Sequence, residues 1–233
     1  MSLHQDLNRI QQLITQTALA YDRKPEGVLL LAVSKQQGVD KIQEAFRLGV
    51  KDFGESYFQE AQKKITALKN LPINWHFIGP IQSNKTKGIA TLFSWIHSIS
   101  RLKIASQLNE YRTKDLSPLN VCIQVNLIDE KSKSGIPPEH TAELALAINK
   151  LPNLKLRGLM TIPPSINDPD LQYDVFIRLN QLMQQLNQTL DLNMDTLSMG
   201  MSDDLIPAIK AGATIVRVGR AIFGERQKSS NAV

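Results

Sequence analysis

An apolar run that ends abruptly in a lysine does most to limit what this 233-residue chain can fold into. Residues Val28 to Val33 are all apolar, and Ser34 and Lys35 follow them directly. Such a run is typical of a strand covered on both faces, as in parallel α/β sheets. Lys35 would then project from the carboxyl end of the strand, where ligands bind in these folds. A partly desolvated amine at that point is a candidate for forming a Schiff base with a carbonyl compound, and a surface lysine with its stem on the core is the alternative.

Short apolar segments alternate with segments of helical spacing along the rest of the chain. A helix is expected over residues 2–21, before the first strand. The spacing predicts strands at residues 28–33, 51–53, 75–78, 95–99, 120–125, 155–160, 196–198 and 214–218. It predicts helices at residues 39–48, 57–68, from about 83, 101–111, 138–149, 170–190 and 203–211.

Eight strand-then-helix units favour an α/β fold with one (β/α)₈ barrel, a TIM barrel, as a single domain over residues 1–224. A doubly wound open sheet is the alternative. The polar residues 225–233 are expected to form a flexible tail.

Composition and charge exclude several classes of protein. The net charge is +5, but the basic residues are scattered, so nucleic acid is not the expected partner and an anionic small ligand explains the charge equally well. No apolar run is long enough to span a membrane, and residues 1–21 have no apolar signal core, so we expect a cytoplasmic protein. Cys122 lies in an apolar run, and the four histidines lack the spacing of metal ligands, so no metal site is expected.

Glycine, serine and arginine gather where the last two strands end. The seventh strand is followed by residues 198–203, Ser-Met-Gly-Met-Ser-Asp, and the eighth by residues 219–224, Gly-Arg-Ala-Ile-Phe-Gly. Glycine lets backbone N–H groups approach a ligand, and Ser202-Asp203 suits a helix cap, so the two loops are typical of a phosphate site, although each glycine alone is explained equally well by a turn. Arg217, inside the eighth strand, needs a partner such as a ring nitrogen, an anionic ligand or a carboxylate on the rim.

Taken together, these motifs resemble the pyridoxal phosphate homeostasis protein family, which is similar to the N-terminal barrel of alanine racemase. The resemblance rests on six segments: Leu31–Lys35, Phe53–Glu60, Trp75–Lys85, Gly158–Pro164, Ser198–Ser202 and Val216–Gly219. It implies fold-type III binding of pyridoxal 5′-phosphate, with Lys35 as the lysine that forms the internal aldimine. By the same resemblance, Ser198 with the backbone of Met199 and Gly200, and Gly219 with Arg220, would hold the phosphate, and Arg217 would face the pyridine nitrogen. Ser56 departs from the asparagine usual in the family, which puts any contact made by that amide in doubt.

The place that the resemblance gives to Arg217 bears on the kind of chemistry that the site supports. A cation at the pyridine nitrogen disfavours the pyridinium and weakens carbanion chemistry. The related racemases add a tyrosine base from a separate domain, whereas here only residues 225–233 follow Gly224. The resemblance therefore implies a monomeric carrier in intracellular vitamin B6 homeostasis, without appreciable turnover, with pyridoxal phosphate-dependent apoenzymes as recipients. A racemase-like enzyme completed by another chain, or a barrel enzyme acting on a phosphorylated metabolite through a substrate Schiff base, are the alternatives.

Overall fold

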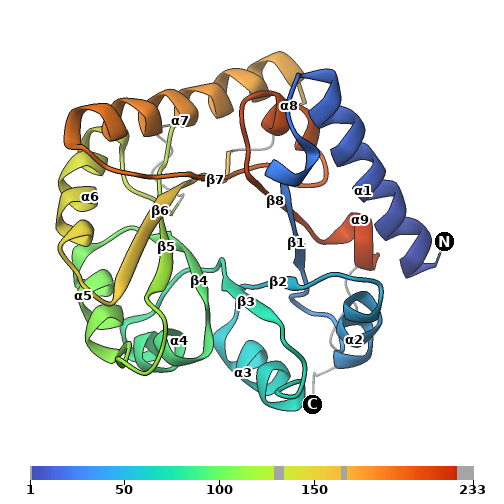
Figure 1. Cartoon of the computed structure of the whole chain (residues 1–233), viewed down its shortest axis with the longest axis horizontal. Helices are drawn as coiled ribbons and strands as arrows, with labels where there is room; N and C mark the ends of the chain where they lie inside the picture. Colours follow the sequence, from blue (N-terminus) through green and yellow to red (C-terminus); the bar gives the residue numbers. More distant parts are fainter. Residues whose placement is uncertain (1, 129–133, 164–166, 225–233) are drawn as a thin grey trace, which may run out of the picture.

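Eight parallel strands form a closed barrel wrapped by helices (Figure 1). The computed structural model describes residues 2–128, 134–163 and 167–224. The strands are β1 Leu29–Val33, β2 Asp52–Glu55, β3 Asn74–Phe77, β4 Trp95–Ile99, β5 Leu119–Gln124, β6 Leu154–Met160, β7 Thr196–Ser198 and β8 Ile215–Val218. They pair in sequence order, and β8 closes on β1 with Leu29 opposite Ile215. The predicted (β/α)₈ barrel is confirmed, and the closure excludes the open sheet.

The helices cover the outside of the barrel, one after each strand. They are α1 Leu3–Ala20, α2 Val39–Arg47, α3 Phe58–Ala67, α4 Thr86–Leu92, α5 Leu102–Tyr111, α6 Thr141–Asn149, α7 Pro169–Leu190, α8 Leu205–Lys210 and α9 Arg220–Phe223, with 3₁₀ turns η1 Pro25–Gly27, η2 Ser83–Lys85 and η3 Pro138–His140. The additional helix α1 is fixed at its start by a capping box between Ser2 and Gln5, and it lies against α8 and α9.

Most boundaries differ from the sequence prediction by one to three residues, and two of these shifts and one helix that was not predicted have identifiable reasons. Strand β2 extends to Glu55, because that carboxylate is buried although its residue type suggested a loop. Helix α8 begins at Leu205 instead of Asp203, because Asp204 occupies the cap position. Helix α9 is too short to produce a helical pattern in the sequence. The predicted tail at residues 225–233 lies outside the described residues.

The barrel interior is partly polar, whereas the layer between barrel and helices is apolar. Ala32 and Phe53 point outward into the main hydrophobic core beneath the helices. In contrast, His97 on β4 contacts Ser198 on β7, and these strands are not neighbours, so the contact crosses the inside of the barrel. Hydrogen-bonding side chains therefore fill part of a space that apolar side chains usually fill.

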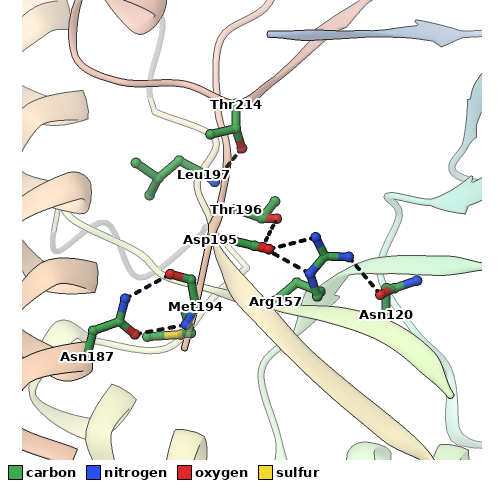
Figure 2. A network of polar contacts seen from close by, with 8 residues as sticks. All are labelled: Asn120, Arg157, Asn187, Met194, Asp195, Thr196, Leu197 and Thr214. Carbon is green, nitrogen blue, oxygen red and sulfur yellow. Dashed lines mark hydrogen bonds and ion pairs between the residues drawn. The ribbon is translucent and has the colours of Figure 1, made fainter. Parts of the chain in front are cut away.

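A polar network fixes the amino-terminal ends of β5 to β8 (Figure 2). Arg157 donates to both carboxylate oxygens of Asp195, at 2.9 and 2.8 Å, and to Asn120 Oδ1 at 3.0 Å. The backbone N–H of Leu197 donates to the Thr214 hydroxyl at 2.9 Å. Bidentate arginine pairing holds geometry strongly, so this end of the barrel is tied together while the carboxyl end is left for ligands.

The described residues contain neither a helix that could span a membrane nor a reactive cysteine. None of the helices in the described residues is both long and apolar enough to cross a bilayer. Cys122 is fully buried, and burial raises the pKa of its thiol to about 12, so this cysteine is an unreactive core residue.

Candidate functional site

A cavity of about 380 Å³ opens at the carboxyl ends of the strands. Its volume lies within the range of small-ligand sites, about 300–1,000 Å³. Residues from β1 and β8 and from the segments after β1, β2, β3, β6, β7 and β8 line it: Val33, Lys35, Ser56, Ile78, Ile162, Met201, Ser202, Asp203, Arg217, Gly219 and Arg220.

Lys35 enters this cavity because it continues the alternation of β1. Val33 and Lys35 are two residues apart, and both line the cavity. The Lys35 side chain is half-buried, as expected for an amine whose stem lies against the barrel. The next residue, Gln36, has a φ of 61°, so the chain turns sharply away after the lysine.

A buried ion pair holds the backbone just before Lys35. Lys64 on α3 donates to the carbonyl oxygen of Ser34 at 2.7 Å and to Glu55 Oε1 at 2.8 Å. The Ser34 hydroxyl donates to the same Glu55 oxygen at 2.6 Å. Glu55 is inaccessible to solvent, and burial, the largest influence, raises the pKa of its carboxyl even though Lys64 and Ser34 act in the opposite direction. The backbone just before Lys35 is thus attached to α3 through the charged groups of Lys64 and Glu55, which are costly to bury without a partner.

The same lysine reaches the residue just after Lys35 through a second carboxylate. Lys64 also pairs with Glu60, one turn earlier on α3. Glu60 Oε1 accepts the backbone N–H of Gln36. Backbone groups on both sides of Lys35 are therefore held from α3, which restrains the direction in which the Lys35 side chain leaves the strand.

Arg217 lies at the base of the cavity and is 4% exposed. Its Nη1 donates to Ser198 Oγ at 2.9 Å, and its Nη2 donates to the Thr161 carbonyl oxygen at 2.8 Å. Burial lowers the pKa of Arg217 to about 10, with the charge of Asp204 acting in the opposite direction, so the guanidinium is still a cation at neutral pH. Within the described ranges, no carboxylate lies at ion-pair distance from it.

The loops after β7 and β8 form one wall of the cavity. Asp204 accepts the backbone N–H of Met201 and so shapes the first loop. Arg220 pairs with Asp203 across the mouth at 2.8 Å, with both side chains mostly exposed. At Gly219 a Cβ atom would lie 3.2 Å from the Val33 carbonyl oxygen, tighter than ordinary contact, so glycine suits the close approach of this turn to β1. Because exposed ion pairs contribute little, an anionic ligand can replace Asp203 as the partner of Arg220 at small cost.

The structure brings together some of the residues that the sequence indicated. Lys35, Arg217, Gly219 and Arg220 line the cavity. Ser198, Met199 and Gly200 do not line it, and all three are buried. The Ser198 hydroxyl faces the barrel interior, where Arg217 and His97 contact it.

The turn at Gly200 explains why the wall is formed by residues 201–203. Gly200 has a φ of 90°, and an added Cβ would lie 2.5 Å from the Cβ of Ala208, so only glycine fits there. The signal for Ser202 and Asp203 was present in the sequence as an apparent helix cap. Ser56 also lines the cavity, so the departure from the family asparagine lies at the ligand site itself.

Comparison with known proteins agrees with this geometry. The family model described as alanine racemase, N-terminal domain, matches residues 6–227. The chain is 50% identical over 231 residues to the pyridoxal phosphate homeostasis protein of Pseudomonas aeruginosa, covering 99% of each sequence. It is also 50% identical over 233 residues to the protein of the same name in Pasteurella multocida, covering 98% of this chain and all of that one.

Solved structures show the same architecture. The structure of PipY from Synechococcus elongatus with pyridoxal phosphate (PLP) bound has a TM-score of 0.81 at 33% identity, covering 91% of this chain and 100% of that chain. Alanine racemase from Clostridium difficile has a TM-score of 0.77 at 14% identity, covering 97% of this chain but 57% of that one. The second likeness concerns the fold alone.

Proposed function

Since the chain belongs to the alanine racemase N-terminal domain family and, within it, to the pyridoxal phosphate homeostasis proteins, we propose that it binds pyridoxal 5′-phosphate in the Lys35 cavity and serves vitamin B6 homeostasis. The observation that carries this proposal is the cavity itself, where an amine, a buried guanidinium and an anion-binding wall face one space. Relatives at 50% identity over the full chain, and a similar structure with the cofactor bound, support it.

The residues of the cavity fit the chemical groups of this cofactor. The cofactor's aldehyde condenses with a primary amine and releases one water. Lys35 supplies that amine, and it is the only lysine lining the cavity in the described part of the chain. Arg217 only donates hydrogen bonds, so it suits an unprotonated ring nitrogen. Gly219, Arg220 and Ser202 suit the phosphate, and the buried residues Ser198, Met199 and Gly200 lead into the turn that places Ser202 in this wall.

The same residues favour holding the cofactor over turnover. A cation at the ring nitrogen makes the ring a weak electron sink. Besides Lys35, the ionisable groups lining the described cavity are two arginines and Asp203, which is exposed and paired with Arg220. This set offers no well-placed second group for moving a substrate proton, and it favours a carrier over a racemase-like enzyme.

The test is to titrate the purified protein with pyridoxal 5′-phosphate and follow the absorption spectrum. Borohydride reduction and peptide mapping then locate the modified residue, and a racemisation assay with L-alanine measures turnover. We expect a stoichiometric yellow complex, modification at Lys35 and no racemisation above the uncatalysed rate. Turnover at ordinary enzyme rates, about 1 s⁻¹ or more, would establish the racemase-like alternative instead.

Arg220 is expected to contribute affinity through the phosphate. Arg220→Gln removes a charge-assisted contact at a partly exposed position, and we expect binding to weaken about tenfold. Pyridoxal, which lacks the phosphate, should bind the variant and the original protein equally. Arg9→Gln is the control, because Arg9 is an exposed arginine that pairs with Asp6 on α1 and does not line the cavity. An equal loss for pyridoxal would place Arg220 away from the phosphate.

The resemblance to the family also implies a cellular setting for this function. We propose a cytoplasmic monomer that delivers the cofactor to apoenzymes. Sedimentation at micromolar concentration should give a single species near the 26.1 kDa of the chain. Reactivation of a cofactor-free PLP enzyme behind a dialysis membrane, compared with direct mixing, tests whether delivery requires contact.

A further inference from the structure

A continuous chain of hydrogen bonds crosses the barrel interior beneath the cavity. Arg217 Nη1 donates to Ser198 Oγ at 2.9 Å, and Ser198 Oγ lies 2.7 Å from His97 Nδ1. His97 Nε2 lies 2.9 Å from His76 Nδ1, and His76 Nε2 lies 3.1 Å from Asp52 Oδ1. The chain therefore runs from the guanidinium under the ligand site, through β7, β4 and β3, to a carboxylate at the start of β2.

With both rings neutral, the Asp52 carboxylate fixes the direction of every bond. It can only accept, so His76 carries its proton on Nε2, and its Nδ1 accepts from His97 Nε2–H. His97 Nδ1 is then unprotonated and accepts the Ser198 O–H, while the Ser198 oxygen accepts from Arg217. With both rings neutral, every link has one donor and one acceptor, and both histidines must carry their proton on Nε2.

The surroundings keep both rings neutral. Neither ring is accessible to solvent, and burial lowers the pKa of His76 and, more strongly, of His97. The charge of Asp52 acts in the opposite direction on His76, and the positive charge of Arg217 adds to the lowering at His97.

Among the described residues, Asp52 is the only carboxylate at ion-pair distance from His76. Trp95 stacks on the His76 ring at a centroid distance of 5.5 Å. The guanidinium of Arg157 lies over the Trp95 ring, 4.7 Å from its centroid.

We propose that Ser198, His97, His76 and Asp52 form an interior relay, a set of positioning residues that orients Arg217 and governs how strongly it donates a hydrogen bond into the cavity. Asp52 polarises the two rings, the rings polarise the Ser198 hydroxyl, and that hydroxyl anchors Nη1 while Thr161 anchors Nη2. The relay thereby balances part of the charge of a buried guanidinium that has no carboxylate beside it among the described residues. This inference deepens the proposed function, because Arg217 is the residue proposed to face the ring nitrogen.

The first test uses the ligand-free protein, so its outcome does not depend on the proposed function. Nitrogen-15 NMR of the histidine rings should show His76 and His97 as Nε2–H tautomers throughout pH 5.5–8. Ser198→Ala removes the donor to His97 Nδ1, and the Nδ1 resonances of His97 and, to a smaller extent, His76 should move. An Nδ1–H tautomer at either ring, or no change at His76 in the variant, would overturn the relay.

The second test measures how the relay affects the absorption of the bound cofactor. Without the Ser198 acceptor, the charge of Arg217 is less well balanced, so the pH midpoint of the bound cofactor's absorption change should fall by about one unit in Ser198→Ala. Ser198→Thr keeps a hydroxyl and should restore the midpoint. His140 is an exposed histidine on η3, so His140→Asn should leave the midpoint unchanged. A midpoint that does not move in Ser198→Ala, or that moves equally in Ser198→Thr, would contradict the proposal.

Discussion

Lys35→Ala is expected to remove the covalent attachment of pyridoxal 5′-phosphate. Without the amine at the end of β1, borohydride reduction should leave no adduct on the peptide that contains residue 35. The remaining contacts of Arg217 and of the phosphate wall still bind the ligand, so affinity should fall about 100-fold, equivalent to ~2.8 kcal/mol, instead of vanishing. The visible absorption of the complex should revert to that of the free aldehyde. Absorption titration and peptide mapping measure both effects.

Two further variants separate the chemistry of Lys35 from its charge and position. Lys35→Arg keeps a cation but lacks a nucleophilic amine, so it should lose the adduct as completely as alanine does. Lys41→Ala is the matched control, because Lys41 is another part-buried lysine, bonded to Gln37 and the Phe223 carbonyl oxygen, outside the cavity. Loss of the adduct in the Lys41 variant, or its persistence in Lys35→Ala, would show that a different amine is the attachment site.

The barrel itself was readable from the sequence because its signal is repeated. Most strands are short apolar runs, and most helices have an apolar stripe, so an error at one boundary leaves the count of eight unchanged. The predicted strands at residues 95–99 and 196–198 agree fully with β4 and β7. The shifts at Glu55 and Asp203 arise where a polar residue type conceals its burial or its place in a turn.

The site was readable only in part, and the reason is geometric. Strand alternation predicts that Lys35 and Arg217 face the cavity, because Arg217 lies in β8 and Lys35 continues the alternation of β1 two residues beyond Val33. The cavity wall formed by the loop after β7 depends on a left-handed turn at Gly200, so residues 201–203 line the cavity while residues 198–200 are buried. Sequence shows that a glycine is present but not the direction in which the chain leaves it.

The buried polar groups were the least readable part of the molecule. His76 and His97 stand 21 residues apart, and the bond between His97 and Ser198 spans 101 residues, so no local pattern connects them. Lys64 is typical of the exposed face of a helix by residue type, yet it is 5% exposed. Long-range pairing of this kind appears only when the fold brings the elements together.

Lys64→Met should have the largest effect on stability. Lys64 is the shared partner of Glu55 and Glu60, and removing one member of a buried pair leaves an uncompensated charge, at a cost of about 3–5 kcal/mol at pH 7. Lys63→Met, at the exposed neighbouring position, should change stability by about 0.5 kcal/mol or less. Urea unfolding of both variants measures the difference.

The loss caused by Lys64→Met should depend on pH in a definite direction. Burial already raises the pKa of Glu55 in the folded state above the ordinary 4.5, and removing Lys64 takes away the largest opposing influence and raises it further. A carboxyl with a raised folded pKa favours the folded state below its unfolded pKa, and this contribution is lost as the pH rises through the folded value. The destabilisation should therefore be smaller at pH 5 than at pH 7. An equal loss at both pH values would mean that Glu55 is not the group left unpaired.

The double variant Lys64→Met with Glu55→Gln should recover most of the lost stability and remove this pH dependence, because it leaves no buried charge at position 55. Lys64 also holds the backbone at Ser34 directly and at Gln36 through Glu60, so the single variant Lys64→Met should slow adduct formation at Lys35. This result would link the stability of α3 to the position of the reactive amine.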